Sequence, residues 1–434
     1  MRPNILYIHS HDSGRYLQPF GQAVPTPNIQ RLAEQGVLFR QAFSVAPTCS
    51  PSRAGLLTGM CPHSAGMTGL AHRGWSLNDY RQHLVHTLRG AGYRTTLIGV
   101  QHEAARPEMI GYDEVVPLKS EDAVDVAPAA VAFLDQAPQQ PFFLSVGFAE
   151  THRPYHQAGP QEDPRYTLPP APLPDTPETR RDMADFKASA RILDEGMGRV
   201  LAALDRNGLA ENTLVICTTD HGIAFPMNKC NLTQHGLGVS LILRGPGGLA
   251  GGRVCDALVS QIDVFPTLCE LLAIQPPAWL QGRSLLPLIR GEADEINDAV
   301  YGEVTYHAAY EPMRTVRTKR YSYIRRFGER KTPVLPNLDD SPSKALWLAS
   351  GWAEQELAAE QLYDLILDPT EAHNIAGEPR LAGVLADMRA RLEAWMRRTN
   401  DPLLQGEPVP APAGAVMNPV DGVSPRDEPI PAVW

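Results

Sequence analysis

Short apolar runs that alternate with helical segments dominate residues 1–305 of this chain. Each run has the length of one strand, and parallel strands buried on both faces are apolar along their whole length. Strands that alternate with helices predict a layered α/β fold with a largely parallel sheet. The predicted strands cover residues 4–9, 95–99, 141–148, 213–219 and 240–243.

The helices between these strands have recognisable ends. Thr26 followed by Pro27 is typical of an N-cap and a first helical residue, and Gly36 ends that helix. Further helices are predicted over residues 79–89 and 179–204. The proline-rich residues 154–177 separate a strand from the long helix and are predicted to form a loop.

The pattern changes in the last third of the chain. Alternating residues over 313–326 predict a β-hairpin, and a closing helix is predicted over 380–398. The basic residues of the hairpin are expected to face solvent, and they are Arg314, Arg317, Lys319 and Arg320.

Three regions follow from this change. They are a catalytic α/β domain over residues 1–305, a small C-terminal α+β subdomain with the hairpin and packing helix over 306–400, and a proline-rich tail over 401–434. Since the tail carries eight prolines in 34 residues, we expect it to form no regular structure.

Charge and hydropathy exclude several classes of protein. A net charge of -10 argues against a general nucleic-acid binder, which neutralises phosphates with basic residues. The sequence has no apolar run of about 18 residues and no leader before the first strand, so we expect no membrane partner and a cytoplasmic location. The six cysteines lack Cys-x-x-Cys spacing and are expected to be reduced.

Polar clusters follow four of the predicted strands, at residues 9–12, 101–102, 150–152 and 220–221. In open α/β sheets ligands bind at the carboxyl ends of the strands, so four such clusters predict one shared site. Histidines and carboxylates that converge there suit a metal ion better than they suit turn capping. The predicted ligands of one divalent ion are His11, Asp12, Asp220 and His221. His9 faces away from Ser10 and is a weaker candidate.

Cys49 begins a helix-like segment that follows a loop. A nucleophile at a helix N-terminus gains from the positive end of the helix dipole and from free N–H groups. A lone cysteine is more often a small buried apolar residue, so the surrounding motif has to decide.

That motif is Cys49-Ser50-Pro51-Ser52-Arg53, followed by Leu57-Thr58-Gly59. It resembles the signature of the formylglycine-dependent sulfatases. Supporting segments lie in matching order at residues 4–14, 26–28, 219–222, 263–267, 362–364 and 368–369, so the resemblance covers about residues 1 to 400.

Within that family the chain is most similar to the heparan N-sulfatase (sulfamidase) branch. The segments that indicate this branch are residues 49–53, 141–144, 152–153, 173–177, 181–182, 312–318 and 400–402. The resemblance implies an alkaline-phosphatase-like fold, with a large mostly parallel central sheet flanked by helices and a small C-terminal α+β subdomain.

The resemblance also implies a mechanism for hydrolysis of sulfate esters or sulfamates. A formylglycine-generating enzyme would oxidise Cys49 to an aldehyde, and one hydroxyl of its hydrate would attack sulfur while the other later expels sulfate. Arg53 would lie beside the aldehyde and Lys229 on the sulfate. His102 would be the base that triggers sulfate release and His152 would lie near the leaving group, roles that suit the pKa of histidine.

This sequence departs from the family at three positions. It has His11-Asp12 where most sulfatases have Asp-Asp, and Asp220-His221 where they have Asp-Asn. Imidazole ligands favour Mn²⁺ or Zn²⁺ over the Ca²⁺ that the resemblance implies, because Ca²⁺ prefers oxygen. A sulfate-binding lysine of the family is Val100 here, so His9 or an arginine is expected to replace its charge.

Two alternatives stay open at the level of sequence. Phosphonate monoester and phosphodiester hydrolases of the same superfamily also carry Asp-His at the fourth cluster. A non-catalytic binder of sulfated ligands is the other alternative, favoured if Cys49 stays a thiol. We expect a small sulfated or phosphorylated substrate, with N-sulfoglucosamine-type sugars as candidates, and leave a homodimer open.

Overall fold

A large sheet forms the centre of the computed structural model, which describes residues 2–406 and 408–433. Its eight strands lie in the order β4-β3-β5-β1-β6-β7-β2-β8. Their bounds are β1 Asn4–His9, β2 Val37–Phe43, β3 Arg94–Gly99, β4 Glu114–Val116, β5 Phe142–Gly147, β6 Thr213–Thr218, β7 Leu241–Arg244 and β8 Arg253–Ser260. β7 runs antiparallel to β6 and β2, whereas the other neighbours are parallel. The predicted, largely parallel sheet is confirmed.

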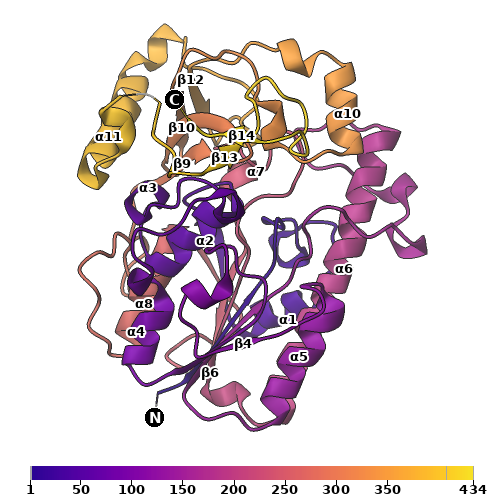
Figure 1. Cartoon of the computed structure of the whole chain (residues 1–434), viewed down its shortest axis with the longest axis vertical. Coiled ribbons are helices and arrows are strands. Elements are labelled where there is room, and N and C mark those ends of the chain that lie inside the picture. Colours follow the sequence, from indigo (N-terminus) through magenta and orange to yellow (C-terminus); the bar gives the residue numbers. More distant parts are fainter. Residues whose placement is uncertain (1, 407, 434) are drawn as a thin grey trace.

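Helices cover both faces of this sheet (Figure 1). One face carries α2 Cys49–Thr58, α4 Leu84–Gly90, α8 Val264–Leu271 and α9 Leu286–Arg290. The other face carries α1 Pro27–Gln35, α5 Ala123–Asp135 and α6 Pro177–Arg206. Two short helices, α3 Pro62–Ala65 and α7 Gln234–Leu237, lie in the connections.

Strand β1 shows why its sequence reads as one apolar run. Ile5 and Tyr7 belong to the core beneath α2 and α4, whereas Leu6 and Ile8 belong to the core beneath α5 and α6. Successive side chains of a strand point to opposite faces, so a strand between two helical layers has no polar face. Beyond Asn4 at its amino end, the polar residues that could serve a site begin at the carboxyl end, with His9.

Two predicted helices differ from the structure in their bounds. The helix predicted over residues 79–89 begins only at Leu84, because His83 caps it by accepting a hydrogen bond from the N–H of Val85. A separate 3-10 turn, Tyr80–Gln82, precedes that cap. The long helix α6 extends beyond its prediction and begins with the cap Thr176.

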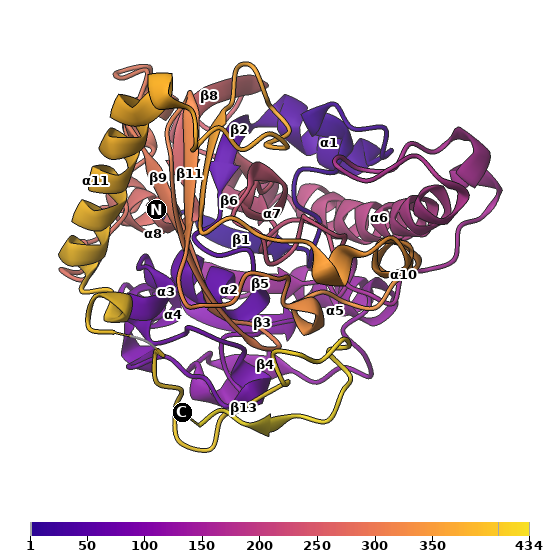
Figure 2. The same ribbon diagram turned by 90° about the horizontal axis from the view of Figure 1, so that it is seen from above.

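A second sheet of four antiparallel strands lies above the carboxyl ends of the first (Figures 1 and 2). It is built from β9 Val300–Tyr306, β10 Tyr310–Arg317, β11 Tyr321–Arg326 and β12 Glu360–Asp364. The helix α11, Ala382–Thr399, packs on one side of it through Leu392 and Trp395. α10, Pro342–Ala349, contacts α6 instead. The predicted hairpin is therefore β10 and β11, which pair antiparallel.

The expectation that the basic hairpin residues face solvent is wrong for Arg314 and Arg317. Arg314 is fully buried and pairs with Asp401 and Glu303. Arg317 is buried against Glu371, with 2.9 Å between Nη1 and Oε2. The alternating pattern of a strand cannot reveal this burial. The acidic residues that pair with the two arginines are distant in the sequence, and they cover a face that would be open to solvent in the hairpin alone. Lys319 and Arg320 are exposed, as expected.

The proline-rich tail does contain regular structure, contrary to expectation. β13 Val416–Met417 pairs with β14 Ile430–Pro431. Residues 408–433, here called the C-terminal strap, also contact three separate segments of the chain. The Asn418 N–H donates to Ala308, Lys344 Nζ donates to the Val423 carbonyl, and Arg73 donates to the Pro425 carbonyl. Prolines limit the strands to two residues, so loop contacts hold most of the strap.

All six cysteines are free. Among the described helices, none combines the length and the apolar character that a membrane crossing requires.

Candidate active site

The carboxyl ends of β1 and β6 bring the two predicted metal-binding pairs together. The strands are parallel neighbours, with His9 opposite Thr218. The N–H of Asp12 donates to Oδ1 of Asp220 over 2.9 Å, so the two turns are joined directly. Asp12 has a φ of 52°, a left-handed conformation that aspartate tolerates better than most residues.

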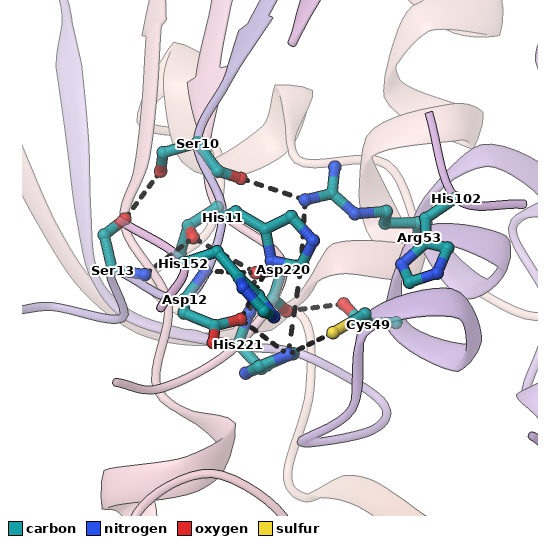
Figure 3. A network of polar contacts seen from close by, with 12 residues as sticks. Ser10, His11, Asp12, Ser13, Cys49, Arg53, His102, His152, Asp220 and His221 are labelled. Carbon is teal, nitrogen blue, oxygen red and sulfur yellow. Dashed lines mark hydrogen bonds and ion pairs between the residues drawn. The ribbon is translucent and has the colours of Figure 1, made fainter. Parts of the chain in front are cut away.

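Five buried side chains meet at this point (Figure 3). Each offers one ligand atom, and these atoms all lie within 4.8 Å of one another. The five are His11, Asp12, Cys49, Asp220 and His221. The structure therefore unites the four predicted ligands with the predicted nucleophile.

Two cations neutralise the buried carboxylates. Lys229 Nζ lies 2.8 Å from Oδ2 of Asp12, and Arg53 Nη2 lies 2.9 Å from Oδ2 of Asp220. Burial opposes ionisation of Asp12, yet Lys229 and His221 hold its pKa well below its usual value. Burial likewise opposes ionisation of Asp220, and chiefly Arg53 lowers its pKa. Both groups are carboxylates throughout the physiological range of pH.

Both imidazoles of the cluster present a ring nitrogen to the carboxylates. His221 Nδ1 donates to the Gly222 carbonyl over 2.9 Å, so the lone pair of Nε2 faces the cluster, 3.2 Å from Oδ1 of Asp12. Burial lowers the pKa of His11 to about 4, although Asp220 opposes this shift, so His11 is neutral. Two carboxylates and two imidazoles at this spacing fit one divalent metal ion.

Cys49 is the first residue of α2 and is only 2% exposed. Its Sγ lies 3.3 Å from Nε2 of His221. Burial raises the pKa of the thiol well above its usual value, although Lys229 opposes this shift. Because the thiolate is the nucleophilic form of cysteine, an unmodified Cys49 is a poor nucleophile at neutral pH.

Arg53 lies one helical turn after Cys49, on the same side of α2. It donates to the ring of His9 over 2.8 Å and to the Ser10 carbonyl over 3.1 Å. Burial and the guanidinium of Arg53 both lower the pKa of His9 well below its usual value. A neutral His9 supplies no positive charge. It therefore does not replace the family's sulfate-binding lysine, whose position is occupied by Val100 here.

The two remaining histidines follow β3 and β5, as the sequence predicts. The His152 ring lies 4.7 Å from that of His11, measured between centroids, and its Nδ1 donates to the Arg153 carbonyl over 2.7 Å. The His102 ring lies 6.0 Å from that of His11. Burial lowers the pKa of His102 well below its usual value, so its ring is neutral.

The structure also brings in residues that the sequence does not single out. Asp339 Oδ2 lies 3.0 Å from Lys229 Nζ, and ligand atoms of Asp12, His152 and Asp339 lie within 4.8 Å of one another. His72 shares a 2.9 Å hydrogen bond with His102. Neither residue follows a predicted strand or belongs to a recognised motif, so the sequence holds no signal for either.

The chain has an alkaline-phosphatase-like fold, and a cluster of side chains that could hold a metal ion lies at the carboxyl end of its mostly parallel sheet. The family model Sulfatase matches residues 3–274, and the model "N-sulphoglucosamine sulphohydrolase, C-terminal" matches residues 225–360. The chain therefore belongs to the sulfatase family and is a hydrolase of sulfuric esters or sulfamates. The family implies a metal ion and a formylglycine.

Similar proteins span nearly the whole chain. The human N-sulphoglucosamine sulphohydrolase is 31% identical over 98% of this chain and 95% of its own length. The Delta 4,5-hexuronate-2-O-sulfatase of Bacteroides thetaiotaomicron is 26% identical over 92% of this chain and 90% of its own.

Solved structures confirm the fold. One determined in complex with its substrate D-glucosamine-2-N,6-O-disulfate has a TM-score of 0.73 at 19% identity, and covers 92% of this chain and 99% of its own. A 2-O GAG sulfatase has a TM-score of 0.74 at 22% identity, covering 98% of this chain and 100% of its own.

Proposed function

We propose that this sulfatase removes sulfate from N-sulfoglucosamine-type sugars, using a formylglycine made from Cys49 and one divalent metal ion. The observation that carries this proposal is the position of Cys49 at the start of α2, among the four side chains proposed as metal ligands. The sugar class is supported by the relative and the solved complex that act on or bind sulfated glucosamine.

His11, Asp12, Asp220 and His221 would hold the ion. When bound, it would supply positive charge to the sulfuryl oxygens, where negative charge develops during the reaction. The nitrogen ligands favour Mn²⁺ or Zn²⁺ over Ca²⁺.

Arg53 and Lys229 would stabilise the same charge from the protein side. Burial opposes the ionisation of both, but Asp220 raises the pKa of Arg53 and Asp12 raises that of Lys229. Both therefore stay cationic in a buried site, where a fixed charge acts more strongly than in water.

His152 and His102 would move the protons. Since Nδ1 of His152 donates to the Arg153 carbonyl, Nε2 is the atom available to protonate a leaving amine or alcohol. His102 is neutral, so it can accept a proton when sulfate is released from position 49.

The test begins with the chain produced together with a formylglycine-generating enzyme. Mass spectrometry of the peptide that contains Cys49 should show the aldehyde, and the protein should react with hydrazides. This protein should hydrolyse N-sulfoglucosamine and aryl sulfates, and Cys49→Ala should abolish turnover while the circular dichroism spectrum stays unchanged.

Two results would contradict the proposal. Full activity of Cys49→Ala would exclude the formylglycine mechanism. A higher kcat/KM for phosphodiesters or phosphonate monoesters than for any sulfated substrate would instead favour the phosphoryl-hydrolase alternative, with which this chain shares the Asp220-His221 pair.

A further inference from the structure

Asp339 brings a carboxylate from the C-terminal part of the chain to the edge of the active site. It lies between the 3-10 turn Leu335–Asn337 and α10. Its Oδ2 pairs with Lys229 over 3.0 Å, and Lys229 pairs in turn with Asp12. The Asp339 side chain is 20% exposed whereas those of Asp12 and Lys229 are 0% and 1% exposed, so Asp339 is the solvent-facing member of this trio.

The segment before Asp339 is anchored firmly. The side chain of Asn337 accepts from the N–H of Ala309 over 2.7 Å and donates to Glu311 over 2.9 Å. The backbone carbonyl oxygen of Asn337 lies 3.0 Å from Nδ1 of His307.

The segment after Asp339 is anchored to the element that holds His152. Ser343 Oγ donates to Oδ2 of Asp182 over 2.6 Å, and Asp182 also pairs with Arg153 over 2.7 Å. Because Arg153 directly follows His152, one chain of contacts fixes both Asp339 and the predicted proton donor. A side chain held in this way is preorganised for recognition.

One oxygen of Asp339 has no donor within the described chain. Lys229 uses Oδ2, and no described residue donates a hydrogen bond to Oδ1. An ionised carboxylate only accepts hydrogen bonds, and it repels a sulfate group at short range. Oδ1 therefore suits the organic part of a substrate and not the sulfuryl group. The Asp339 carboxylate also lies within 4.8 Å of a ring nitrogen of His152.

We propose that Asp339 is a specificity-determining residue, which binds a hydroxyl or ammonium group of the substrate close to the sulfated atom. This inference rests on the proposed function and narrows its substrate class to sugars and amino sugars with free donors at that position. The same carboxylate disfavours substrates that carry a second anion there. A site that holds a hydrogen-bond acceptor in a fixed position discriminates strongly against a substrate without the matching donor, because the acceptor is then left unpaired.

The experiment measures kcat/KM of the wild type and of Asp339 variants on two substrates. N-sulfoglucosamine carries hydroxyl donors next to the sulfated nitrogen, whereas 4-nitrophenyl sulfate carries none. Asp339→Ala should lower kcat/KM for N-sulfoglucosamine about 10- to 100-fold, mainly through KM, as expected for a hydrogen bond to a charged group. Asp339→Asn keeps an acceptor oxygen and should show a smaller loss. Values for 4-nitrophenyl sulfate should stay close to wild type.

Asp340→Asn is the matched control. Its carboxylate pairs with Lys344 and Ser424 and lies next to Asp339 in the sequence. This control should behave as wild type on both substrates, which separates a local disturbance of the loop from a loss of substrate recognition.

Three outcomes would overturn the inference, and they differ from one another. Equal losses on both substrates in the Asp339 variants would mean that Asp339 acts only by positioning Lys229. Wild-type hydrolysis of 4-nitrophenyl sulfate but of no sugar sulfate would exclude the substrate class. A wild-type enzyme with verified formylglycine that hydrolyses neither substrate would show that the proposed function itself is wrong.

Discussion

The Sγ atom of Cys49 faces the same nitrogen of His221 that faces the acidic cluster, because Nδ1 of this ring is bound to the Gly222 carbonyl. Cys49, the proposed nucleophile position, is thus in direct contact with a proposed metal ligand. Both residues are buried. A change at either residue should act on both the metal and the chemistry.

The metal preference can be measured directly. We expect chelation to abolish activity and Mn²⁺ or Zn²⁺ to restore it better than Ca²⁺, because two of the proposed ligands are imidazoles. His221→Ala should lower the metal content found by elemental analysis, whereas the exposed His373→Ala should keep it. Best recovery with Ca²⁺ and unchanged metal content in His221→Ala would place the imidazoles outside the metal coordination sphere.

His152 and His102, the two histidines proposed to transfer protons, should give different kinetic defects when they are replaced. His152→Ala should cost most for amine and sugar-alcohol leaving groups and least for nitrophenyl esters, which leave without a proton. Its Nε2 is the free nitrogen, since Nδ1 binds the Arg153 carbonyl. Steady-state rates across a series of leaving groups provide the measurement, and a loss that is independent of the leaving group would argue for a structural role.

His102→Ala should instead stall the enzyme after its first turnover. The expected trace is a burst of product about equal to the enzyme concentration, followed by slow turnover. Stopped-flow or quenched-flow assays with 4-nitrophenyl sulfate measure it. Absence of a burst, with a rate reduced from the first turnover onward, would show that His102 acts before sulfate release.

The buried Arg314 should be important for stability although it lies far from the chemistry. Arg314→Leu leaves Asp401 and Glu303 buried without their cation, so we expect a loss of about 3–5 kcal/mol in the free energy of unfolding. Arg320→Leu is the control, because its side chain is 57% exposed and its pair with Asp364 should contribute less than about 1 kcal/mol. Chemical denaturation compares the two, and equal losses would contradict the assignment.

Glu103 should make stability depend on pH. Burial raises its pKa from 4.5 to about 7, although Arg53 opposes this shift, so the folded state holds the proton more tightly than the unfolded chain. Its contribution is fully present below pH 4.5 and is lost as the pH rises through 7. Glu103→Gln keeps an oxygen for the His102 N–H and should exceed wild type by about 1 to 3 kcal/mol at pH 8, but not at pH 4. Denaturation at both pH values tests this; an identical pH dependence of both proteins would contradict it.

The parallel sheet could be predicted because β1, β3, β5 and β6 carry their own signal, an apolar run that ends in polar residues. The same signal located His11, Asp12, Asp220 and His221, since neighbouring parallel strands end at one edge. Cys49 and Arg53 came from a contiguous motif.

Contacts between distant segments could not be predicted in this way. Asp339 reaches Lys229 only because the C-terminal sheet lies over the catalytic one, and a lone aspartate in a loop carries no pattern. Arg314 reads as an exposed strand residue until Asp401, 87 residues later, covers it. In both cases the chain has to fold before the partner exists.

The burial of Cys49 determines whether its proposed modification can come before or after folding. Cys49 is 2% exposed and is the first residue of α2, in which every residue is buried. A modifying enzyme cannot reach its thiol once the chain has folded. The proposed oxidation of Cys49 to formylglycine would therefore have to take place on a nascent or incompletely folded chain.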